Sequence, residues 1–434
     1  MFRGAPVLFM LLVLLSSSQA QDSRQAYVLQ KIFIEGNKTT KDFIILRELP
    51  FKPGDTVTSR EIEFGRERIY STGLFTKVLV QPEPVSKTTI DLLVYVEERW
   101  YIWPYPVIGF HDRSLSRFYA GAGIVHLNFR GRDEQLAGMF ALGYDPFGSI
   151  TFTSPSIGPG KDYILSMGVS YSRGRNAVIQ PGYSSGEFDN TFGEMHIGAG
   201  RRFGIFNTVT LGTSYNYVSR NSDTTGLVIS PTGTDVFATL ELSYVYDSRD
   251  LKSYATEGSF LYLSLEKYGL GESLVNFGRL SFDARGYVSP WDFLTLAARV
   301  HGNFAEGPQI PPYNHVFIGY YERIRGMFNT VSEGESMMGA NVEVRIPIIK
   351  QLYIQIPDFP LRQFISNRIA LYWNFFFDAG ETAGKRLQFT ENNALYGYGG
   401  GLSLLLPYDA IIQFDYARGS DKHWEFVLDF GATL

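Results

Sequence analysis

The sequence predicts a transmembrane β-barrel of about 16 antiparallel strands, preceded by one small α+β domain. Three observations support this fold class. The 434 residues are rich in aromatic side chains (15%) and glycine (44 residues), yet only 44% are hydrophobic. After the N-terminal leader, no segment has the roughly 20 consecutive apolar residues that a membrane helix needs. From residue 99 onward, segments of about ten residues alternate apolar and polar side chains, as barrel strands do.

Residues 1–20 have the pattern of a secretory signal peptide. Arg3 precedes the apolar run VLFMLLVLL, and the small residues Ser18 and Ala20 follow it. A retained membrane anchor is the weaker alternative, because this run is far shorter than the roughly 20 residues of a spanning helix. We therefore expect the mature chain to begin near Gln21. Since the chain has no cysteine, packing and backbone hydrogen bonds must stabilise it without disulfides.

The first domain is expected over residues 27–98, with the order β-α-α-β-β. VLQKIFIEGN reads as a strand, and TTKDFIILREL has the apolar spacing of a helix. Thr58 and Glu61 form a capping box at the start of a second helix, which ends at Gly73. LFTKVLVQ and TTIDLLVYVEE then read as strands because their apolar residues alternate.

Residues 99–434 are expected to form the barrel. In residues 235–247, the face with Leu240 and Leu242 should meet lipid, and the face with Thr239 and Glu241 should line the lumen. A soluble β-sandwich explains neither the number of strands nor the outward aromatic residues. The strands are expected near 101–110, 118–129, 133–144, 148–155, 162–173, 190–204, 207–219, 235–247, 257–269, 274–289, 292–304, 336–348, 366–379, 394–406, 409–418 and 423–433.

The connection over residues 305–335 is the longest between barrel strands, and loops of this length are usually functional or disordered. It contains HVFIGYYERIRGMFN, which is too aromatic for a disordered tip. We expect this loop to fold back into the barrel. Arg325 would then lie in a partly desolvated lumen, where a buried charge needs a carboxylate partner.

A candidate partner for Arg325 is Asp378 in YWNFFFDAG. The strand period places Asp378 on the same face as Asn374 and Phe376. A charge facing lipid is costly, so this face should line the lumen. An arginine–carboxylate pair here would tether the loop to the barrel wall. In the alternative interpretation the two charges are unrelated, one solvated and the other lining a pore.

Several of these segments resemble known motifs. Residues 27–98 resemble a POTRA domain in IFIEGNKTT, STGLFTKV and VYVEE. The IRG of IRGMF and the FFDAG strand resemble the paired loop and strand motifs of the BamA/TamA-like outer membrane protein assembly factor superfamily, whose barrels are of the bacterial surface antigen type. Met327 departs from the loop motif, which usually has an aromatic residue there. The resemblance implies loop-motif roles for Ile324, Arg325 and Gly326, and strand-motif roles for Phe376, Asp378 and Gly380.

The resemblance also implies a location and a function. The barrel would lie in the bacterial outer membrane, with its single POTRA domain in the periplasm. This domain would bind unfolded outer membrane protein clients by adding their strands to its sheet edge. Clients would be inserted into the membrane at a seam between the first and last barrel strands. Outer membrane lipids and accessory periplasmic proteins or lipoproteins are the other implied partners.

The first barrel strand, in WYIWPYPVIGF, contains Pro104 and Pro106. Each lacks an N–H group, and their spacing places both missing donors on one side of the strand. The prolines either weaken the seam or end the linker from the first domain, and both interpretations stay open. Trp100, Tyr101 and Trp103 are expected to belong to an interfacial aromatic girdle.

Two other transport functions are alternatives, namely a two-partner-type polypeptide secretion pore and a passive outer membrane channel. Enzyme function is not expected, because the 6 histidines lack the spacing of a metal site and the chain has neither a GxSxG elbow nor a phosphate loop. The net charge of -5, with scattered lysine and arginine, argues against nucleic acid binding. We expect no cofactor and no metal.

Overall fold

In the computed structural model, the described residues are 26–110, 115–177, 187–220, 228–271, 273–356, 366–384 and 394–431. The expected signal peptide at 1–20 lies outside them. Among the described residues, no helix combines the length and the apolarity that crossing a membrane requires.

The N-terminal domain is a four-stranded sheet in the order β2-β1-β4-β3, with two helices. β1 runs parallel to β4, whereas β3 is antiparallel to it. The expected element order is confirmed, with one addition, the strand β2. Two residues are too few to show an alternation of side chains, so the sequence pattern does not reveal β2. The elements are β1 (Tyr27–Glu35), α2 (Asp42–Leu46), β2 (Thr56–Val57), α3 (Ser59–Tyr70), β3 (Phe75–Pro84) and β4 (Thr89–Glu98).

The capping box that the sequence predicts starts α3. The Thr58 hydroxyl accepts a hydrogen bond from the backbone N–H of Glu61, and the Glu61 carboxylate accepts one from the backbone N–H of Thr58 at 2.8 Å. These bonds satisfy two N–H groups that a helix start leaves without partners. Apolar side chains from both helices and from the inner face of the sheet form the core, including Leu29, Ile44, Ile45, Ile69, Val78, Leu92 and Val94.

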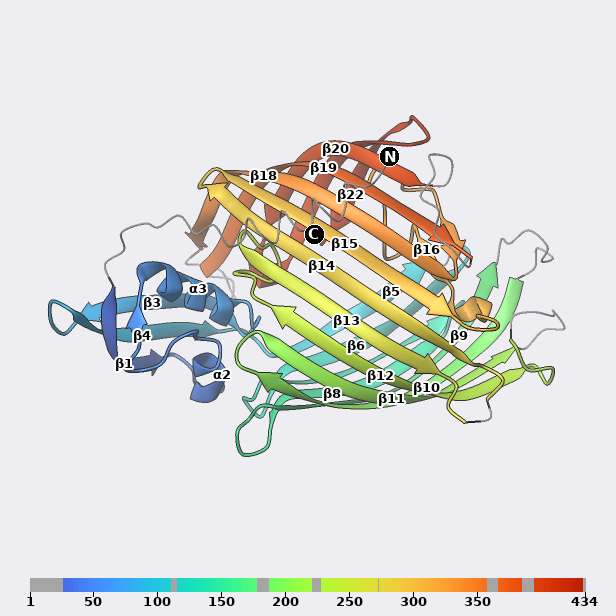
Figure 1. Ribbon diagram of the computed structural model, residues 1–434, viewed down its shortest axis with the longest axis horizontal. Coiled ribbons are helices and arrows are strands. Elements are labelled where there is room, and N and C mark those ends of the chain that lie inside the picture. The colour runs from blue at the N-terminus through green and yellow to red at the C-terminus, as the bar shows by residue number, and fades with distance from the viewer. Residues whose placement is uncertain are drawn as a thin grey trace.

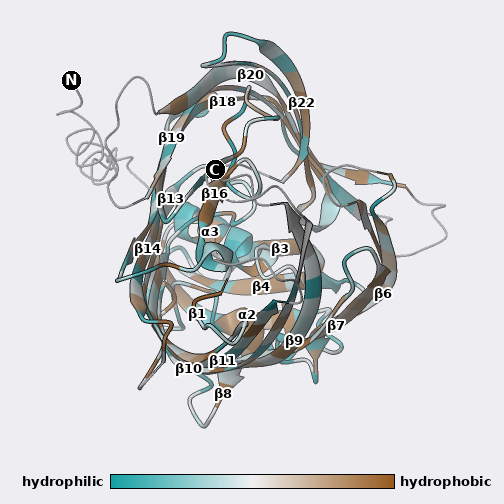
Figure 2. Cartoon of the chain, turned by 90° about the vertical axis from the view of Figure 1, so that its right-hand side faces the viewer, coloured by the Kyte–Doolittle hydropathy of each residue, from teal (hydrophilic) through white to brown (hydrophobic). Residues whose placement is uncertain are grey.

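Most of the described residues after this domain form a sixteen-stranded antiparallel sheet that curls into a barrel (Figures 1 and 2). The expected barrel is therefore confirmed. Its strands are β5 (Ile102–Phe110), β6 (Phe118–Phe129), β7 (Glu134–Gly143), β8 (Phe147–Ile157), β9 (Tyr163–Ala177), β10 (Glu187–Phe203), β11 (Asn207–Arg220), β12 (Thr234–Asp247), β13 (Gly258–Tyr268), β14 (Phe277–Trp291), β15 (Leu294–Glu306), β18 (Ser336–Gln355), β19 (Ser366–Ala383), β20 (Leu395–Leu405), β21 (Ile411–Gly419) and β22 (Trp424–Phe430).

β19 was expected over 366–379 but continues to Ala383, which pairs with Ser336. β18 was expected over 336–348, but its pairing with β19 continues to Gln355, opposite Ser366, through register shifts on either side of Ile349. Such irregularities break the two-residue period of apolar side chains, so the sequence pattern stops where the pairing does not.

Side chains alternate between the two faces of the barrel wall as expected. On β12, Leu240 and Leu242 are exposed on the outside, whereas Thr239 is buried. On β19, Trp373, Phe375 and Phe377 are exposed and alternate with Asn374, Phe376 and Asp378, which are buried. An apolar exterior around a polar interior is the arrangement that a lipid environment requires.

Candidate functional site

The loop between β15 and β18 returns into the barrel (Figure 2). It contains a short 3-10 helix, η2 (Pro312–Asn314), and a two-stranded sheet of β16 (Val316–Ile318) and β17 (Ser332–Gly334). Ile318, Ile324 and Met327 form a buried apolar cluster within it. This cluster holds the polar residues of the loop against the barrel wall.

Arg325 projects from this loop into a buried cluster of carboxylates. Its Nε donates to Asp378 Oδ2 and its Nη2 donates to Asp378 Oδ1, both at 2.8 Å, which is a two-bond pair. Its Nη1 donates to Glu343 Oε2, also at 2.8 Å. The backbone N–H of Arg325 adds a bond to Asp378 at 3.2 Å. The structure thus brings together the two charged residues of the sequence motifs.

The carboxylates of this cluster have further partners. Asn341 Nδ2 donates to Asp378 Oδ1 at 3.0 Å, and Arg345 Nε donates to Glu343 Oε1 at 2.8 Å. The guanidinium of Arg325 lies 3.5 Å from the centroid of the Phe376 ring, so the aromatic residue of the strand motif packs on the arginine itself. Arg325 and Arg345 thus lie among carboxylates of opposite charge, which offsets much of the cost of burying them.

Glycines allow the loop backbone to lie directly against the wall. Gly326 has φ +87°, and a Cβ there would lie 2.8 Å from the carbonyl carbon of Arg418 on β21. A Cβ at Gly397 on β20 would lie 1.9 Å from the carbonyl oxygen of Arg325. Neither position accepts a larger residue without movement of backbone. Gly380, in the strand motif, lies beneath Ile318 and Ile324 of the loop.

Additional contacts anchor the loop to other strands. Arg299 on β15 donates to both carboxylate oxygens of Glu322 at 2.9 Å and also binds Asp283 on β14. The backbone N–H of Phe328 donates to Glu425 on β22 at 2.8 Å. Met327 is buried, and its sulfur accepts a hydrogen bond from the Ser420 hydroxyl at 3.1 Å. The loop therefore connects β14 and β15 with β18 to β22.

The two end strands of the sixteen-stranded sheet are β5 and β22. Among the described residues, no backbone pairing joins them. We call the line between β5 and β22 the seam. Pro104 and Pro106 lie inside β5, opposite Ile124 and Ala122 of β6, so the interpretation in which they end the linker is wrong.

The hydrogen-bond pattern of β5 shows which side the prolines affect. The backbone N–H of Leu127 donates to the carbonyl of Tyr101, so this pair is a hydrogen-bonded one. Hydrogen-bonded and non-hydrogen-bonded pairs alternate along an antiparallel ladder. Pro104 and Pro106 therefore occupy non-hydrogen-bonded positions relative to β6, and their nitrogen atoms face the seam. Two N–H donors are missing from the edge of β5 that faces β22.

The edge of β22 that faces the seam follows from the same alternation. The backbone N–H of Gly431 donates to the carbonyl of Ile411, which sets the hydrogen-bonded positions of β21 and β22. Backbone groups of the even-numbered residues of β22 therefore face the seam. The side chains of these residues are exposed on the outside of the barrel: Trp424, Phe426, Leu428 and Phe430.

The N-terminal domain lies at one end of the barrel (Figure 1) and is attached to it by buried charges. Glu48 is 3% exposed and accepts hydrogen bonds from Arg68 at 3.0 Å and from Arg202 of the barrel at 2.6 Å. Arg47 donates to Asp133, in the turn between β6 and β7, at 2.7 Å. Arg368 of β19 donates to Glu67 of α3 at 2.8 Å.

Burial and charge act in opposite directions on the carboxyl groups of this interface. Burial by itself would raise the pKa of Glu48, but Arg202 and Arg68 hold that pKa below its ordinary value. Burial raises the pKa of Asp133 to about 6, although Arg47 and Lys252 oppose the shift. Glu48 is thus a charged anchor, whereas Asp133 changes its charge near neutral pH.

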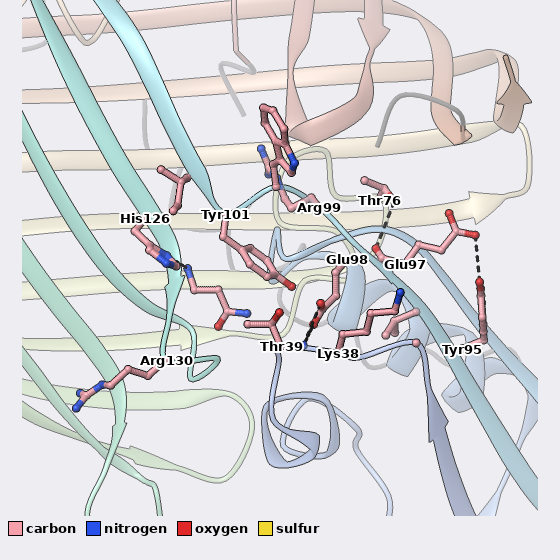
Figure 3. A pocket seen from close by; sticks show the side chains of 15 residues that line it. Lys38, Thr39, Thr76, Tyr95, Glu97, Glu98, Arg99, Tyr101, His126 and Arg130 are labelled. Carbon is pink, nitrogen blue, oxygen red and sulfur yellow. Dashed lines mark hydrogen bonds between the residues drawn. The ribbon is translucent and has the colours of Figure 1, made fainter. Parts of the chain in front are cut away.

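A cavity of about 1060 Å³ lies where the N-terminal domain joins β5 (Figure 3). Its lining includes Lys38, Glu98 and Tyr101. The Glu98 carboxylate accepts bonds from the backbone N–H groups of Thr39 and Thr40, and the Tyr101 hydroxyl lies 2.9 Å from that of Thr40. Tyr101 therefore packs on the N-terminal domain, whereas the neighbouring Trp100 is exposed as a girdle residue should be.

Sequence reasoning missed several members of this site. Glu343 lies in NVEVRIP, where a charge alternates with apolar residues, and this pattern is a usable signal for a lumen-facing carboxylate. One carboxylate oxygen of Asp415 lies 3.8 Å from Nη1 of Arg325. The sequence around Asp415 contains no motif that distinguishes it from other lumen-facing residues. The interface residues Glu48, Arg68 and Arg202 belong to no motif. Their partnership depends on how the domain meets the barrel.

Comparisons with known families agree with this architecture. Residues 128–431 match the Omp85 superfamily domain, and residues 27–99 match a POTRA domain described as a surface antigen variable number repeat. The chain is 23% identical over 319 residues to the outer membrane protein assembly factor BamA of Nitratidesulfovibrio vulgaris, which covers 70% of this chain and 38% of that protein. A stretch of 77 residues, 18% of this chain, is 32% identical to BamA of Neorickettsia risticii and covers 10% of that protein. The chain thus spans less than half the length of these curated relatives.

Solved structures share the fold. BamA from Haemophilus ducreyi lacking POTRA domains 1-3 has a TM-score of 0.55 at 18% identity, with 94% of this chain and 84% of that chain covered. CdiB from Escherichia coli has a TM-score of 0.57 at 12% identity, with 93% of this chain and 75% of that chain covered. At these identities, the likeness concerns the fold alone.

Proposed function

This chain belongs to the Omp85 superfamily and carries one POTRA domain, and we propose that it inserts client polypeptides into the outer membrane at the seam. Its barrel is an outer membrane β-barrel and its role is assembly or transport, not enzymatic catalysis. The POTRA domain would lie in the periplasm and receive unfolded outer membrane proteins. Membrane lipids and accessory periplasmic proteins or lipoproteins are the other partners in this proposal. No cofactor or metal takes part.

The observation that carries the proposal is the unpaired edge of β5. A client strand needs free backbone groups to pair with, and the backbone of the described part of β5 pairs with β6 alone. Because Pro104 and Pro106 remove two donors from this edge, a neighbouring strand forms fewer bonds with it than with a regular edge. A weak seam lets β22 be displaced by a client strand, and the remaining N–H and C=O groups of β5 start the new ladder.

The loop supports the same mechanism from the other side of the seam. Its anchors at Asp378, Glu343 and Glu425 hold β18, β19 and β22 to one internal structure. Separation at the seam would leave this wall intact. The proposed role of the motif formed by Arg325 and Asp378 is therefore to keep the C-terminal wall rigid during client entry.

The test is site-specific crosslinking in membranes that contain the reconstituted protein. The chain has no cysteine, so a single cysteine at Ile108, on the exposed side of β5, is unambiguous. Unfolded barrel clients should form adducts at Ile108→Cys. Leu265→Cys, on the equally exposed outside of β13, is the matched control and should form none. Equal adduct yields at both positions would contradict the insertion mechanism. So would the absence of adducts at Ile108→Cys in an active protein.

A polypeptide secretion pore of the two-partner kind is the second candidate. The fold likeness to CdiB, with a TM-score of 0.57, favours it. In that case a client in transit would contact the lumen, so adducts should appear at Glu241→Cys inside β12 and not at Ile108→Cys. A passive channel would instead show steady conductance and no client adducts at either position. Removal of residues 27–98 should abolish client handling in both polypeptide mechanisms and leave a channel conducting.

A further inference from the structure

Three side chains connect the start of β5 to the C-terminal side of the barrel. Arg99 directly follows β4, three residues before β5 begins, and Trp103 lies on β5. Tyr408 lies in η4 (Pro407–Asp409), the turn between β20 and β21. The guanidinium carbon of Arg99 lies 4.3 Å from the centroid of the Tyr408 ring and 5.4 Å from that of Trp103. The two rings meet edge to face at 5.7 Å. We call these three residues the clasp.

The clasp spans the seam at the end that faces the POTRA domain. β22 pairs with β21 up to Phe430 opposite Ile412, so the end of β22 lies beside the turn that carries Tyr408. β5 begins at Ile102 on the other side of the seam. The contacts of Arg99 and Trp103 with Tyr408 therefore reach across the line where the two end strands lack backbone pairing.

Arg99 also binds the POTRA domain. Its Nη1 donates to the carbonyl of Gly73 at 3.0 Å, and its backbone N–H donates to the carbonyl of Leu74 at 3.2 Å. Gly73 and Leu74 form the connection from α3 to β3. Arg99 belongs to the lining of the cavity shown in Figure 3, at the junction of the domain and β5. One arginine thus joins the domain, the first strand and the C-terminal wall.

The backbone at Tyr408 is unusual for a residue with a Cβ. Its φ is 67° and its ψ is 31°, in the left-handed region that glycine or asparagine adopts at lower cost. Strained backbone of this kind is retained where the surrounding structure uses it. Here the conformation belongs to the turn that presents the tyrosine ring to Arg99 and Trp103.

We propose that Arg99, Trp103 and Tyr408 form a releasable clasp that holds the seam closed and couples it to the position of the POTRA domain. The inference rests on the proposed function, because it describes how the same seam is regulated. Cation–π and aromatic contacts are weak enough to break and re-form, unlike a row of backbone hydrogen bonds. When the domain moves, the hydrogen bond to the Gly73 carbonyl pulls Arg99 away from the Tyr408 ring. The side-chain contacts that hold the seam closed are then lost.

The experiment measures the seam without any client. Spin labels at Ile108→Cys on β5 and Phe426→Cys on β22, both exposed, report their separation by pulsed electron paramagnetic resonance in lipid nanodiscs. The otherwise unchanged chain should give one narrow distance distribution. Tyr408→Ala should add a population longer by roughly one strand spacing, about 5 Å. Tyr408→Phe keeps the ring and is the matched control, which should retain the narrow distribution.

Two further variants separate the ring from other effects. Tyr408→Gly removes the ring and also relieves the left-handed backbone, so it should show the same longer population as Tyr408→Ala. Arg99→Gln should show it too, and should also broaden the distance between labels at Val85→Cys in the POTRA domain and Phe293→Cys in the turn after β14. Arg99→Gln gives the second readout if the Tyr408 variants fail to fold.

A narrow distribution in correctly folded Tyr408→Ala and Arg99→Gln proteins would overturn the clasp. This result is distinguishable from failure of the proposed function. A clasp that controls the distance in a protein that forms no client adduct at Ile108→Cys would leave the clasp standing and remove the insertion mechanism. An unchanged distance between the labels in a protein that does form the client adduct would remove the clasp and leave the insertion mechanism standing.

Discussion

Arg325 in the inward-folded loop and Asp378 on β19 form a buried pair in which Nε and Nη2 of the arginine each lie 2.8 Å from a different carboxylate oxygen. The asparagine, glutamate and phenylalanine around them complete the coordination of the arginine and its partner. These bonds fix the loop against the wall at this position. The structure therefore predicts that the pair acts as a unit.

Loss of either member should destabilise the barrel by about 3–5 kcal/mol, because each leaves an uncompensated buried charge. The double variant Arg325→Ala with Asp378→Ala should cost less than the sum of the single variants. Urea unfolding in lipid vesicles measures these differences. Arg323→Ala is the matched control, since the Arg323 side chain is 40% exposed and lies 3.9 Å from Asp429, and it should change stability by less than about 1 kcal/mol. Additive losses in the double variant would contradict the tether.

Replacing both prolines of β5 should strengthen the seam. Pro104→Val with Pro106→Val supplies two N–H donors that face β22, and each added backbone bond contributes about 1 kcal/mol. We expect slower client insertion and greater resistance to unfolding. Pro290→Val on β14, far from the seam, controls for the general effect of removing a proline. If the double variant inserts clients as fast as the original chain, the prolines do not set the strength of the seam.

Glu48→Gln should weaken the attachment of the POTRA domain to the barrel. The substitution leaves Arg68 and Arg202 without their shared carboxylate, a loss that in buried pairs costs roughly 3–5 kcal/mol. Hydrogen exchange of α3 should become faster while exchange of the barrel strands stays unchanged. Glu63→Gln on the exposed side of α3 is the control. Identical exchange in the two variants would show that Glu48 does not anchor the domain.

Attachment of the domain should strengthen as the pH falls from 8 to 5. The pKa of Asp133 is about 6 when the domain is attached, whereas its ordinary value is 3.8, so the attached state binds the proton more tightly. The stabilisation is complete below the ordinary pKa and is lost as the pH rises through about 6. Arg47, Lys252 and Glu48 are the charged groups that act on Asp133. In this window Glu48 stays charged, because its pKa is lowered.

The distance between labels at Val85→Cys and Phe293→Cys, followed against pH, measures this effect. The population with the domain attached should increase toward pH 5. Asp133→Asn cannot titrate and should remove the dependence. A pH response that persists unchanged in Asp133→Asn would assign it to another group.

Features that depend on local patterns of residues can be predicted from the sequence. Alternation of apolar and polar residues gave the sixteen strands, because each barrel strand separates lipid from lumen along its own length. Thr58 and Glu61 marked the start of α3 because a capping box lies within four consecutive residues. The contact of Arg325 with Asp378 was also predicted, since a desolvated arginine needs a carboxylate and the two motifs offered one.

Contacts between groups that are distant in the chain depend instead on the tertiary fold. Glu343 joins Arg325 and Asp378 because three separate segments converge inside the barrel. The prolines of β5 face the seam because the register with β6 fixes the direction of every backbone group, and a shift by one residue would reverse it. Arg99 meets Tyr408, more than three hundred residues later in the chain, only because the sheet curls until its first and last strands are neighbours. These contacts depend on closure and register, which no local pattern of side chains specifies.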